Sequence, residues 1–342
     1  MKRLTVLLMF GGQSSEHDVS LMSAKNVYAA IDKSTYNVVL GYIDREGKWW
    51  LLKDWSDKPD EERQSQIVVV PGSSAIMTMA DSQMIHVDVL FPMLHGKFGE
   101  DGTIQGLAEM AHIAVVGPGL ESSAVCMDKH LAKQILEASG IPVVPWVAIN
   151  KGDDVDKAVR RVKTIDPTGP WFVKPSRAGS SVGVTRVTDI AHMSRAVALA
   201  HEHDSLALIE TAIIGRELEV AVLGNVPNHK ASGIGEIIPG SEFYDYNEKY
   251  SLDSSSQVIL DAGLPSALTK VIRKYATETY AALECKGMAR IDFLLSDELV
   301  PYVMEINTLP GFTNISMFPK LWQQKGLPQP ELIDRLISLA IE

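Results

Sequence analysis

The stretch MARIDFLLSDELVPYVMEINTLPG, from Met288 to Gly311, constrains the fold most, because apolar and polar residues alternate on both sides of a polar break. Alternation predicts strands, in which every second side chain lies on the same face. The break Ser296-Asp297-Glu298 is typical of a turn, so the stretch predicts a hairpin of two short strands. The apolar face is expected to hold Ala289, Ile291, Phe293, Met304 and Ile306. The opposite face is expected to gather Arg290, Asp292, Glu305 and Asn307.

Asp292, Glu305 and Asn307 would place two carboxylates and a carboxamide on one surface. Such oxygen donors suit Mg²⁺ that binds phosphates, rather than zinc. An isolated alternating strand more often carries a solvated polar face. Here an Asn-Thr-Leu-Pro-Gly turn follows directly and Arg290 joins the acids, which favours a functional site. What the site acts on must be read from the rest of the chain.

Charge and composition exclude several classes of protein. The chain has 342 residues, 46% of them apolar, and a net charge of −11, so neither a nucleic acid nor an anionic membrane surface is expected as its main partner. Its two cysteines, Cys126 and Cys285, are too few for a disulfide framework or a zinc site, and buried free thiols are expected. The apolar start LTVLLMF is short and ends at Gly11-Gly12, which favours a buried first strand over a signal peptide. We therefore expect a cytoplasmic protein without a membrane span.

The first third alternates strands and helices, which predicts an α/β unit with an open parallel sheet. The strands are expected at residues 4–10, 38–43, 85–91 and 113–116, with a hairpin arm at 47–52 and helices at 19–31 and 103–111. Ligands of such sheets bind beyond the carboxyl ends of the strands, where the loops GGQSSEH and HGKFGEDG lie. Glu16 and His95 in these loops are candidate contacts for a small zwitterion, although either residue alone would more often be a solvated or capping group. GGQSSEH lacks the dinucleotide fingerprint, so hydride chemistry is not supported.

The middle third carries a phosphate-binding signal. One helix is expected over residues 122–140, with Lys129 within it. An apolar strand then delivers Lys174 into the loop PSRAGSSVG, whose small residues would let backbone N–H groups approach phosphate oxygens and whose Ser180 and Ser181 add donors. A Walker loop places its lysine after the glycines, so this is not a P-loop, and on the loop alone a Gly-rich hairpin turn remains equally consistent. Glu210 at the end of strand 206–209 is a candidate for the amino group and ribose of a nucleotide.

The segment over residues 240–256 is polar and aromatic and has no helical or strand period. A long segment of this kind in a compact protein is usually a lid or a binding loop. Its candidate working groups are Tyr246, Lys249 and Tyr250, with Lys249 meeting phosphates once the lid closes. Beyond the hairpin, a loop with Ser316 and Met317 precedes a helix at residues 331–339.

Five motifs in this order, HGKFGEDGTIQG, KPSRAGSSVG, FYDYNEKY, MARIDF and MEINTLPGFT, resemble the D-alanine–D-alanine ligase family of the ATP-grasp superfamily. The resemblance covers nearly the whole chain. It implies an α/β (α+β) ATP-grasp fold of three domains, at residues 1–121, 122–213 and 214–342, with ATP held between the last two and a lid at 240–256. It also implies a cytoplasmic homodimer that uses small-molecule substrates and makes the dipeptide of peptidoglycan precursors.

The resemblance implies roles for individual residues. Two Mg²⁺ ions, which Mn²⁺ can replace, would be held by Asp292, Glu305 and Asn307. The nucleotide contacts would be Lys129, Lys174, Ser181, Glu210, Glu217, Phe243, Lys249 and Asn307. Arg290 and the Gly311 N–H would stabilise the oxyanion of the tetrahedral intermediate. Glu16 would receive the ammonium of the first D-alanine beside His95, and Ser180 and Tyr250 would link the lid to Glu16. Ser316 and Met317 would meet the second D-alanine, with Met317 at a position where the family often has Leu.

Three alternatives remain at this stage. A ligase that joins D-alanine to D-lactate is disfavoured by Tyr250 within the sequence EKY, and one that uses D-serine is disfavoured by Met317, where Arg is often expected. Another ATP-grasp carboxylate–amine ligase is disfavoured by Glu16, Tyr250 and Ser316. A nucleotide-binding sensor without catalysis would be expected to lack one of the acids or Arg290, and all are present.

Overall fold

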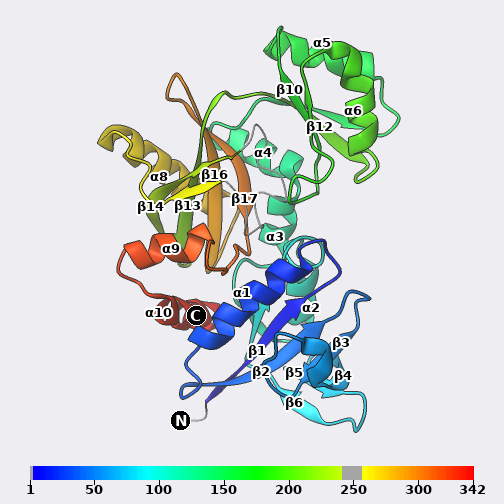
Figure 1. Cartoon of the computed structure of the whole chain (residues 1–342), viewed down its shortest axis with the longest axis vertical. Coiled ribbons are helices and arrows are strands. Elements are labelled where there is room, and N and C mark those ends of the chain that lie inside the picture. The colour runs from blue at the N-terminus through cyan, green and yellow to red at the C-terminus, as the bar shows by residue number, and fades with distance from the viewer. Residues whose placement is uncertain (1–2, 241–255) are drawn as a thin grey trace.

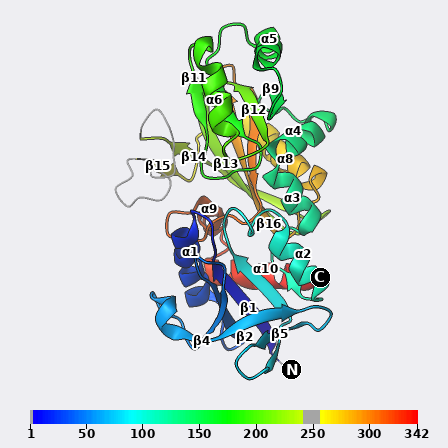
Figure 2. The same cartoon turned by 90° about the vertical axis from the view of Figure 1, so that its right-hand side faces the viewer.

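The computed structural model describes residues 3–240 and 256–342 and contains three β-sheets (Figure 1). The sheet nearest both chain termini has eight strands, a second has four strands, and the third, with five strands, contains the hairpin predicted from the sequence. Figure 2 shows the small green four-stranded unit at the end of the molecule opposite the first sheet.

The eight-stranded sheet is built around β1 (Leu4–Gly11), whose side chains are almost all buried. Four of its strands are parallel, as predicted, and they lie in the order β2-β1-β7-β8. The others extend the sheet by antiparallel pairing. The other strands are β2 (Tyr36–Ile43), β3 (Trp49–Leu52), β4 (Arg63–Val70), β5 (Ala75–Thr78), β6 (Met84–His86), β7 (Val89–Met93) and β8 (Ala114–Val115). The helices of this part are α1 (His17–Ala30), η1 (Pro59–Glu62) and α2 (Thr103–Met110).

The four-stranded sheet is antiparallel, in the order β11-β10-β12-β9. Two helices, α5 and α6, cover one face and bury a core of small and branched side chains against it. The elements are β9 (Trp146–Asn150), α5 (Val155–Ile165), β10 (Trp171–Pro175), β11 (Thr185–Val187), η2 (Ile190–His192), α6 (Met193–Ala200) and β12 (Leu206–Thr211). The loop PSRAGSSVG therefore joins two paired strands, β10 and β11, as its sequence predicted.

The five-stranded sheet is also antiparallel, in the order β15-β14-β13-β16-β17. Helices α8 and α9 pack against β14 and β13. The elements are β13 (Gly215–Leu223), β14 (Lys230–Ile238), β15 (Gln257–Ile259), α8 (Ser266–Ala282), β16 (Met288–Ser296), β17 (Pro301–Asn307) and α9 (Met317–Gln324).

The prediction of a single helix over residues 122–140 is wrong. The structure has two helices there, α3 (Leu120–Met127) and α4 (Lys129–Ala138). Asp128 between them has an extended backbone, and its side chain accepts hydrogen bonds from the N–H groups of His130 and Leu131. Its Oδ1 also accepts a hydrogen bond from Ser176 Oγ at 2.7 Å. Asp128 thus acts as an N-cap that begins a new helix at Lys129.

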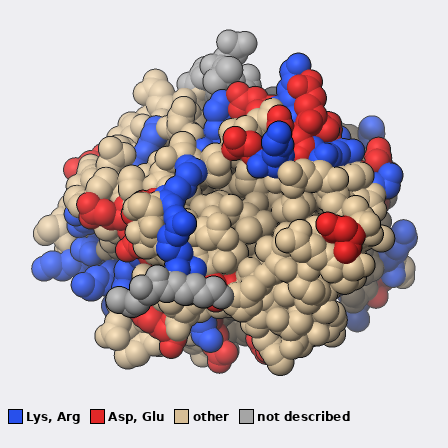
Figure 3. Space-filling view, turned by 90° about the horizontal axis from the view of Figure 1, so that it is seen from below, with Lys and Arg blue, Asp and Glu red and all other residues tan. Residues whose placement is uncertain are grey.

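The last helix of the chain, α10 (Gln329–Ile341), completes the core of the first sheet. Its buried side chains share one hydrophobic cluster with Val6, Leu8 and Phe10 of β1, and the Tyr36 hydroxyl donates to Asp334. Figure 1 shows α10 and α9 lying beside α1. On the face in Figure 3, charges of both signs surround a largely uncharged area.

Both cysteines are buried, and their sulfur atoms lie 4.0 Å apart although the residues are distant in sequence. The expectation of buried thiols is confirmed, and the structure adds that they are neighbours between α3 and the segment leading to β16. Across residues 3–240 and 256–342, every helix is too short or too polar to cross a membrane.

Candidate active site

The hairpin β16–β17 gathers the polar residues that its alternation predicted. Arg290 lies opposite Asn307 and Asp292 lies opposite Glu305. Arg290 donates to both oxygens of Asp292, at 2.7 and 2.8 Å, and Asn307 Nδ2 donates to Asp292 Oδ2 at 2.9 Å. Asp292 is consequently buried behind Arg290 and Asn307, in a fixed orientation.

A bulge in this hairpin changes the face on which Met304 lies. The strand register shifts between Asp292 and Phe293, so that Val303 rather than Met304 pairs with Phe293 and enters the core. Met304 lies instead beside Glu305 in the lining of a cavity. The prediction that Met304 lies on the apolar face is therefore wrong, because the extra residue of a bulge interrupts the strict alternation of side chains.

A cavity of about 120 Å³, here the smaller cavity, lies in front of the hairpin. It collects the amino-acid-binding candidates from the described parts of the chain. Those in its lining are Glu16, His95, Ser180, Arg290, Gly311, Ser316 and Met317, and the metal-binding candidate Asn307 lies there as well. These side chains come from the loops after β1, β7 and β10, from β16 and β17, and from the segment before α9.

Gly96 lets its loop approach Glu16 closely, and Gly179 lies at ordinary contact distance on another loop. A Cβ atom on Gly96 would fall 2.8 Å from Glu16 Oε2, and one on Gly179 would fall 3.8 Å from it. His95 is buried beside them, with its ring nitrogens 3.1 Å from the Leu309 carbonyl oxygen and 3.2 Å from Ser23 Oγ. Burial lowers the pKa of His95, while the charge of Glu16 opposes that effect. The ring is therefore held between the first sheet and the loop that follows β17.

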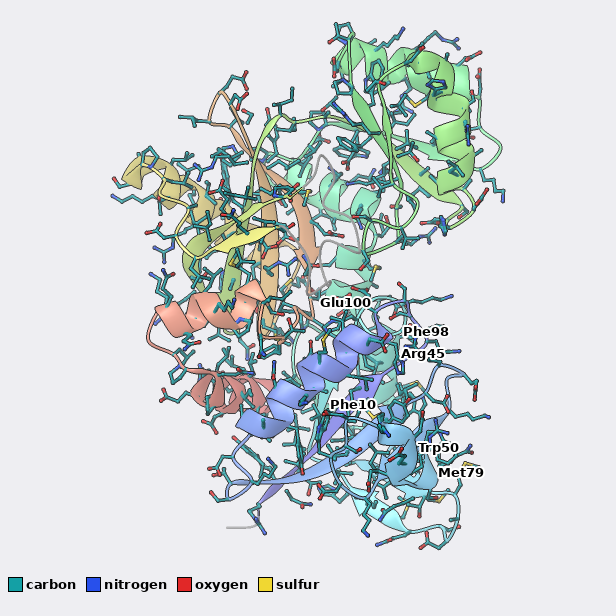
Figure 4. All side chains as sticks on the ribbon, viewed as in Figure 1. Phe10, Arg45, Trp50, Met79, Phe98 and Glu100 are labelled. Atoms are coloured by element: carbon teal, nitrogen blue, oxygen red, sulfur yellow. The ribbon has the colours of Figure 1, made fainter. Side chains whose placement is uncertain are left out.

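Two carboxyl groups in the smaller cavity escaped the sequence analysis. Glu100 lies in the motif HGKFGEDG, accepts a 2.7 Å hydrogen bond from Gly96 N, and has its pKa raised to about 8 by burial and by the charge of Glu16. Figure 4 shows Glu100 on the side of the first sheet that faces the third. Glu219 on β13 lies opposite Asp292, and its Oε2 is 3.1 Å from Arg290 Nε. A Glu within the apolar run of β13 was the available signal for Glu219.

A second cavity of about 480 Å³, here the larger cavity, lies between the four-stranded and five-stranded sheets. It collects the nucleotide-binding candidates Lys129, Lys174, Ser181, Glu210 and Glu217. Phe172, Leu294 and Met304 supply apolar walls. The two cavities meet, because both are lined by Gly179, Ser180, Ile237 and Glu305.

Glu210 lines the larger cavity and lies between two lysines, Lys174 and Lys133. Lys174 Nζ is 2.7 Å from Glu210 Oε2, and Lys133 Nζ is 2.9 Å from Glu210 Oε1. Burial acts to raise the pKa of Glu210, but the two ammonium groups outweigh it and lower that pKa. Burial also lowers the pKa of Lys133 to about 8. Lys133 was not predicted, although it lies one turn from Lys129 on the same helix.

Lys129 connects the glycine-rich loop to the hairpin. Its Nζ donates to the Ala178 carbonyl oxygen at 2.8 Å and lies 2.8 Å from Glu305 Oε1. In the same loop Ser180 and Ser181 have φ angles of 51° and 58°, a left-handed conformation that costs energy for residues other than glycine. Such strain is typical of loops at functional sites.

Three of the predicted site residues, Phe243, Lys249 and Tyr250, and the additional candidate Tyr246 lie outside the described residues. At the ends of that segment, Gly240 N donates to Ser256 Oγ at 3.3 Å.

The donor set on the hairpin fits magnesium. Asp292 and Glu305 are direct neighbours across the two strands, Asn307 Nδ2 donates to Asp292 Oδ2, and Glu305 and Asn307 both line the smaller cavity. The set contains oxygen donors without thiolate or imidazole, which is the chemistry that Mg²⁺ prefers.

Two family models match the chain over most of its length. The model described as D-ala D-ala ligase N-terminus matches residues 5–118, and the one described as D-ala D-ala ligase C-terminus matches residues 135–338. Among curated proteins, the chain is 43% identical to the D-alanine–D-alanine ligase A of Chromobacterium violaceum and 41% identical to the D-alanine–D-alanine ligase of Proteus mirabilis. Each match covers 100% of this chain and 96% of the relative.

Solved structures of similar proteins have the same architecture. The D-alanine–D-alanine ligase from Coxiella burnetii superposes with a TM-score of 0.89 at 36% identity, covering 100% of this chain and 94% of the other. The VanG D-Ala:D-Ser ligase from Enterococcus faecalis superposes with a TM-score of 0.90 at 34% identity, covering 99% and 100%. The α/β ATP-grasp fold expected from the motifs is confirmed by these neighbours.

Proposed function

This chain belongs to the D-alanine–D-alanine ligase family, and we propose that it joins two D-alanines in an ADP-forming reaction that consumes ATP. The observation that carries the proposal is the junction of the two cavities at Ser180 and Glu305. One cavity has the size and charged lining for amino acids, and the other has the size, apolar walls and lysines for a nucleotide. A phosphoryl group bound at their junction can pass from one substrate to the other.

On the nucleotide side, Lys129, Lys174 and Ser181 bind the phosphates of ATP, while Glu210 and Glu217 bind its base and ribose. Phe172, Leu294 and Met304 pack against the base. Phe243 and Lys249 complete the site in this proposal. Asn307 and the two carboxylates of the hairpin bind the ATP phosphates through metal ions.

The residues that would hold two Mg²⁺ ions are Asp292, Glu305 and Asn307. The bound ions, for which Mn²⁺ can substitute, supply positive charge against the phosphate oxygens. In the structure the two carboxylates already have cations beside them, because Arg290 pairs with Asp292 and Lys129 pairs with Glu305. These ion pairs fix the orientation of the two carboxylates.

The proposed chemistry has two steps. A carboxylate oxygen of the first D-alanine attacks the γ-phosphorus, so that ADP leaves and an acyl phosphate forms. The amine of the second D-alanine, after losing a proton, then attacks the carbonyl carbon, and inorganic phosphate leaves as the peptide bond forms. The Arg290 guanidinium and the Gly311 N–H stabilise the oxyanion of the tetrahedral intermediate.

Glu16 receives the ammonium group of the first D-alanine in this proposal, with His95 in the same subsite. Ser316 binds the carboxylate of the second D-alanine and Met317 contacts its methyl group. Ser180 and Tyr250 form the polar link between the lid and Glu16. An acyl phosphate hydrolyses readily in open water, so the segment 240–256 is proposed to close over it.

The remaining parts of the proposal concern the whole molecule. The domains are residues 1–121, 122–213 and 214–342, with ATP between the last two. The protein acts as a cytoplasmic homodimer and supplies the dipeptide for peptidoglycan precursors. Size-exclusion chromatography with light scattering tests the dimer independently of activity.

A coupled assay of ADP release tests the activity, with the product identified by mass spectrometry. D-Alanine, D-serine and D-lactate are offered singly and in pairs with ATP and Mg²⁺. We expect turnover with D-alanine alone and D-alanyl-D-alanine as the product. The fold similarity to a D-Ala:D-Ser ligase makes D-serine the second candidate for the second subsite. No turnover with D-alanine alone would contradict the main proposal, and a mixed dipeptide as chief product would favour the second.

A further inference from the structure

Strand β14 presents two glycines, Gly233 and Gly235, to helix α9, because a Cβ atom on either glycine would lie nearest to a side chain of that helix. Helix α9 packs against this strand. Glycine inside a strand often marks a place where another group approaches the backbone closely. Different side chains of α9 approach the two glycines, so a substitution at one can serve as the control for the same substitution at the other.

At Gly235 the approaching group is Met317. A Cβ atom on Gly235 would lie 2.4 Å from Met317 Sδ and 2.6 Å from its Cε, far inside van der Waals contact. At Gly233 the nearest atom to such a Cβ is Gln324 Oε1 at 3.5 Å, an ordinary contact. The thioether of Met317 therefore occupies the space that a side chain at position 235 would need.

Met317 also lines the smaller cavity, next to Ser316. It is the first residue of α9 and is almost fully buried. Ile237, two residues beyond Gly235 on β14, lines the same cavity, and Glu219 of the same lining lies opposite Gly235 on β13. Gly235 is thus placed directly behind a wall of this cavity.

We infer that Gly235 is a positioning residue that shapes the subsite of the second D-alanine by giving the Met317 side chain its place against β14. This inference rests on the function proposed above, in which Met317 contacts the methyl group of that substrate. A methionine has three flexible side-chain torsions, so its position must be fixed by its surroundings. Because Gly235 has no side chain, it leaves room for the Met317 thioether against β14. A methyl group at position 235 would push the thioether toward the smaller cavity.

The test is the variant Gly235→Ala with D-alanine, ATP and Mg²⁺. The displaced Met317 atoms are the end of a flexible side chain, and a further close contact is the Ile259 carbonyl oxygen, 3.2 Å from such a Cβ. Ile259 lies on the edge strand β15, where a small shift relieves that contact, so we expect the variant to fold. The two Michaelis constants for D-alanine are obtained from dipeptide formation over a wide concentration range. Overpacking at such a contact is expected to raise the constant for the second D-alanine about tenfold, while the constant for the first and kcat change by less than about twofold.

Two further variants separate this role from a general effect on folding. Gly233→Ala adds the same methyl group on the same strand face without meeting Met317, so both constants should stay at their wild-type values. The double variant Gly235→Ala/Met317→Ala removes the overlap and should bring the second constant back toward that of Met317→Ala alone. Thermal unfolding of each variant reports on stability separately from the kinetics.

Several results would overturn the inference: an unchanged second constant in Gly235→Ala, an equal change in Gly233→Ala, or no recovery in the double variant. If Gly235→Ala does not fold, the double variant decides, because its failure to fold as well would show that Gly235 acts independently of Met317. These outcomes are distinct from failure of the proposed function, in which wild-type protein would form no dipeptide.

Discussion

The two cavities use charge in different ways. Among the residues that the structure describes, four carboxyl groups line the smaller cavity, those of Glu16, Glu100, Glu219 and Glu305, together with the guanidinium of Arg290. In the larger cavity lysines accompany the acids, and apolar side chains form part of the walls. A lining rich in carboxyl groups suits substrates that bring ammonium groups, whereas lysines and apolar walls suit a triphosphate attached to a flat base. Selectivity for each substrate is thus built into the balance of charge.

The largest expected effect comes from removing the single guanidinium in the lining of the smaller cavity. Arg290→Gln should reduce kcat about 10³-fold, because an oriented positive donor for the oxyanion is lost. Initial rates at saturating ATP and D-alanine would show this loss of kcat. Arg216→Gln is the matched control, since Arg216 lines the larger cavity and pairs with Glu236 at 2.7 Å. A comparable loss of kcat in that variant would contradict the contrast between the cavities.

The next effect is on the stability of the protein, through the ion pairs of Glu210 in the larger cavity. Lys133→Met should lower the free energy of unfolding by about 3 kcal/mol, because it leaves the buried Glu210 with one of its two lysines. Urea unfolding of the ligand-free protein measures the change. Lys274→Met removes an exposed pair with Glu278 on α8 and should cost less than about 1 kcal/mol. Equal losses in the two variants would mean that Glu210 does not depend on Lys133.

The pH dependence of stability should have opposite signs at Glu100, in the smaller cavity, and at Lys133, which pairs with Glu210 of the larger cavity. The pKa of Glu100 is raised to about 8 in the folded protein, so its contribution to stability is complete at low pH and is lost as pH rises through about 8. The pKa of Lys133 is lowered to about 8, so its contribution is present above the unfolded pKa of lysine and is lost as pH falls through about 8.

Unfolding experiments across pH test these opposite signs in the ligand-free protein. Glu100→Gln should flatten the decline of stability between about pH 5 and 8, and Lys133→Met should flatten the rise above about pH 8. A Glu100→Gln profile parallel to wild type below pH 8 would show that this carboxyl group titrates normally.

The smallest effect is expected at the junction of α3 and α4. Asp128→Ala removes an N-cap and should lower the free energy of unfolding by about 1 kcal/mol, whereas Asp128→Asn should retain most of it. Because Lys129 begins α4, the alanine variant should also raise the Michaelis constant for ATP slightly. Thermal unfolding and initial rates check the two effects, and identical melting temperatures for both variants would argue against the cap.

Much of this arrangement could be predicted from local sequence, because alternation and turn residues are local signals. The register that brings Arg290, Asp292, Glu305 and Asn307 together follows from the hairpin pattern. The bulge at Met304 does not, since no residue type in β17 announces an extra residue. The break at Asp128 was missed because the apolar period continues across it, and only the hydrogen bonds of its side chain reveal the new helix.

The missed charged residues depended on contacts between distant segments. Glu100 and Lys133 are ordinary in their local sequence, and each becomes informative only beside Glu16 or Glu210. Glu219 stands out as a charge within an apolar run, but only its contact with Arg290 gives it a place in the site. The antiparallel strands β4 and β5 were also not predicted, because their pattern is irregular and only pairing with the first sheet defines them. The single strand predicted at residues 85–91 is divided in the structure into β6 and β7, which pair with different neighbours. The roles of Phe243, Lys249 and Tyr250 stay predictions.

The place of α10 has a consequence for how the chain matures during synthesis. Strand β1 is synthesised long before α10, whose Leu332, Ile333 and Leu336 cover part of the same apolar cluster. Contacts of such long sequence separation form late and slow the folding of a protein. The nascent segment around β1 therefore keeps this apolar surface exposed until α10 has been synthesised. Truncation of the last helix should accordingly yield aggregated rather than merely inactive protein.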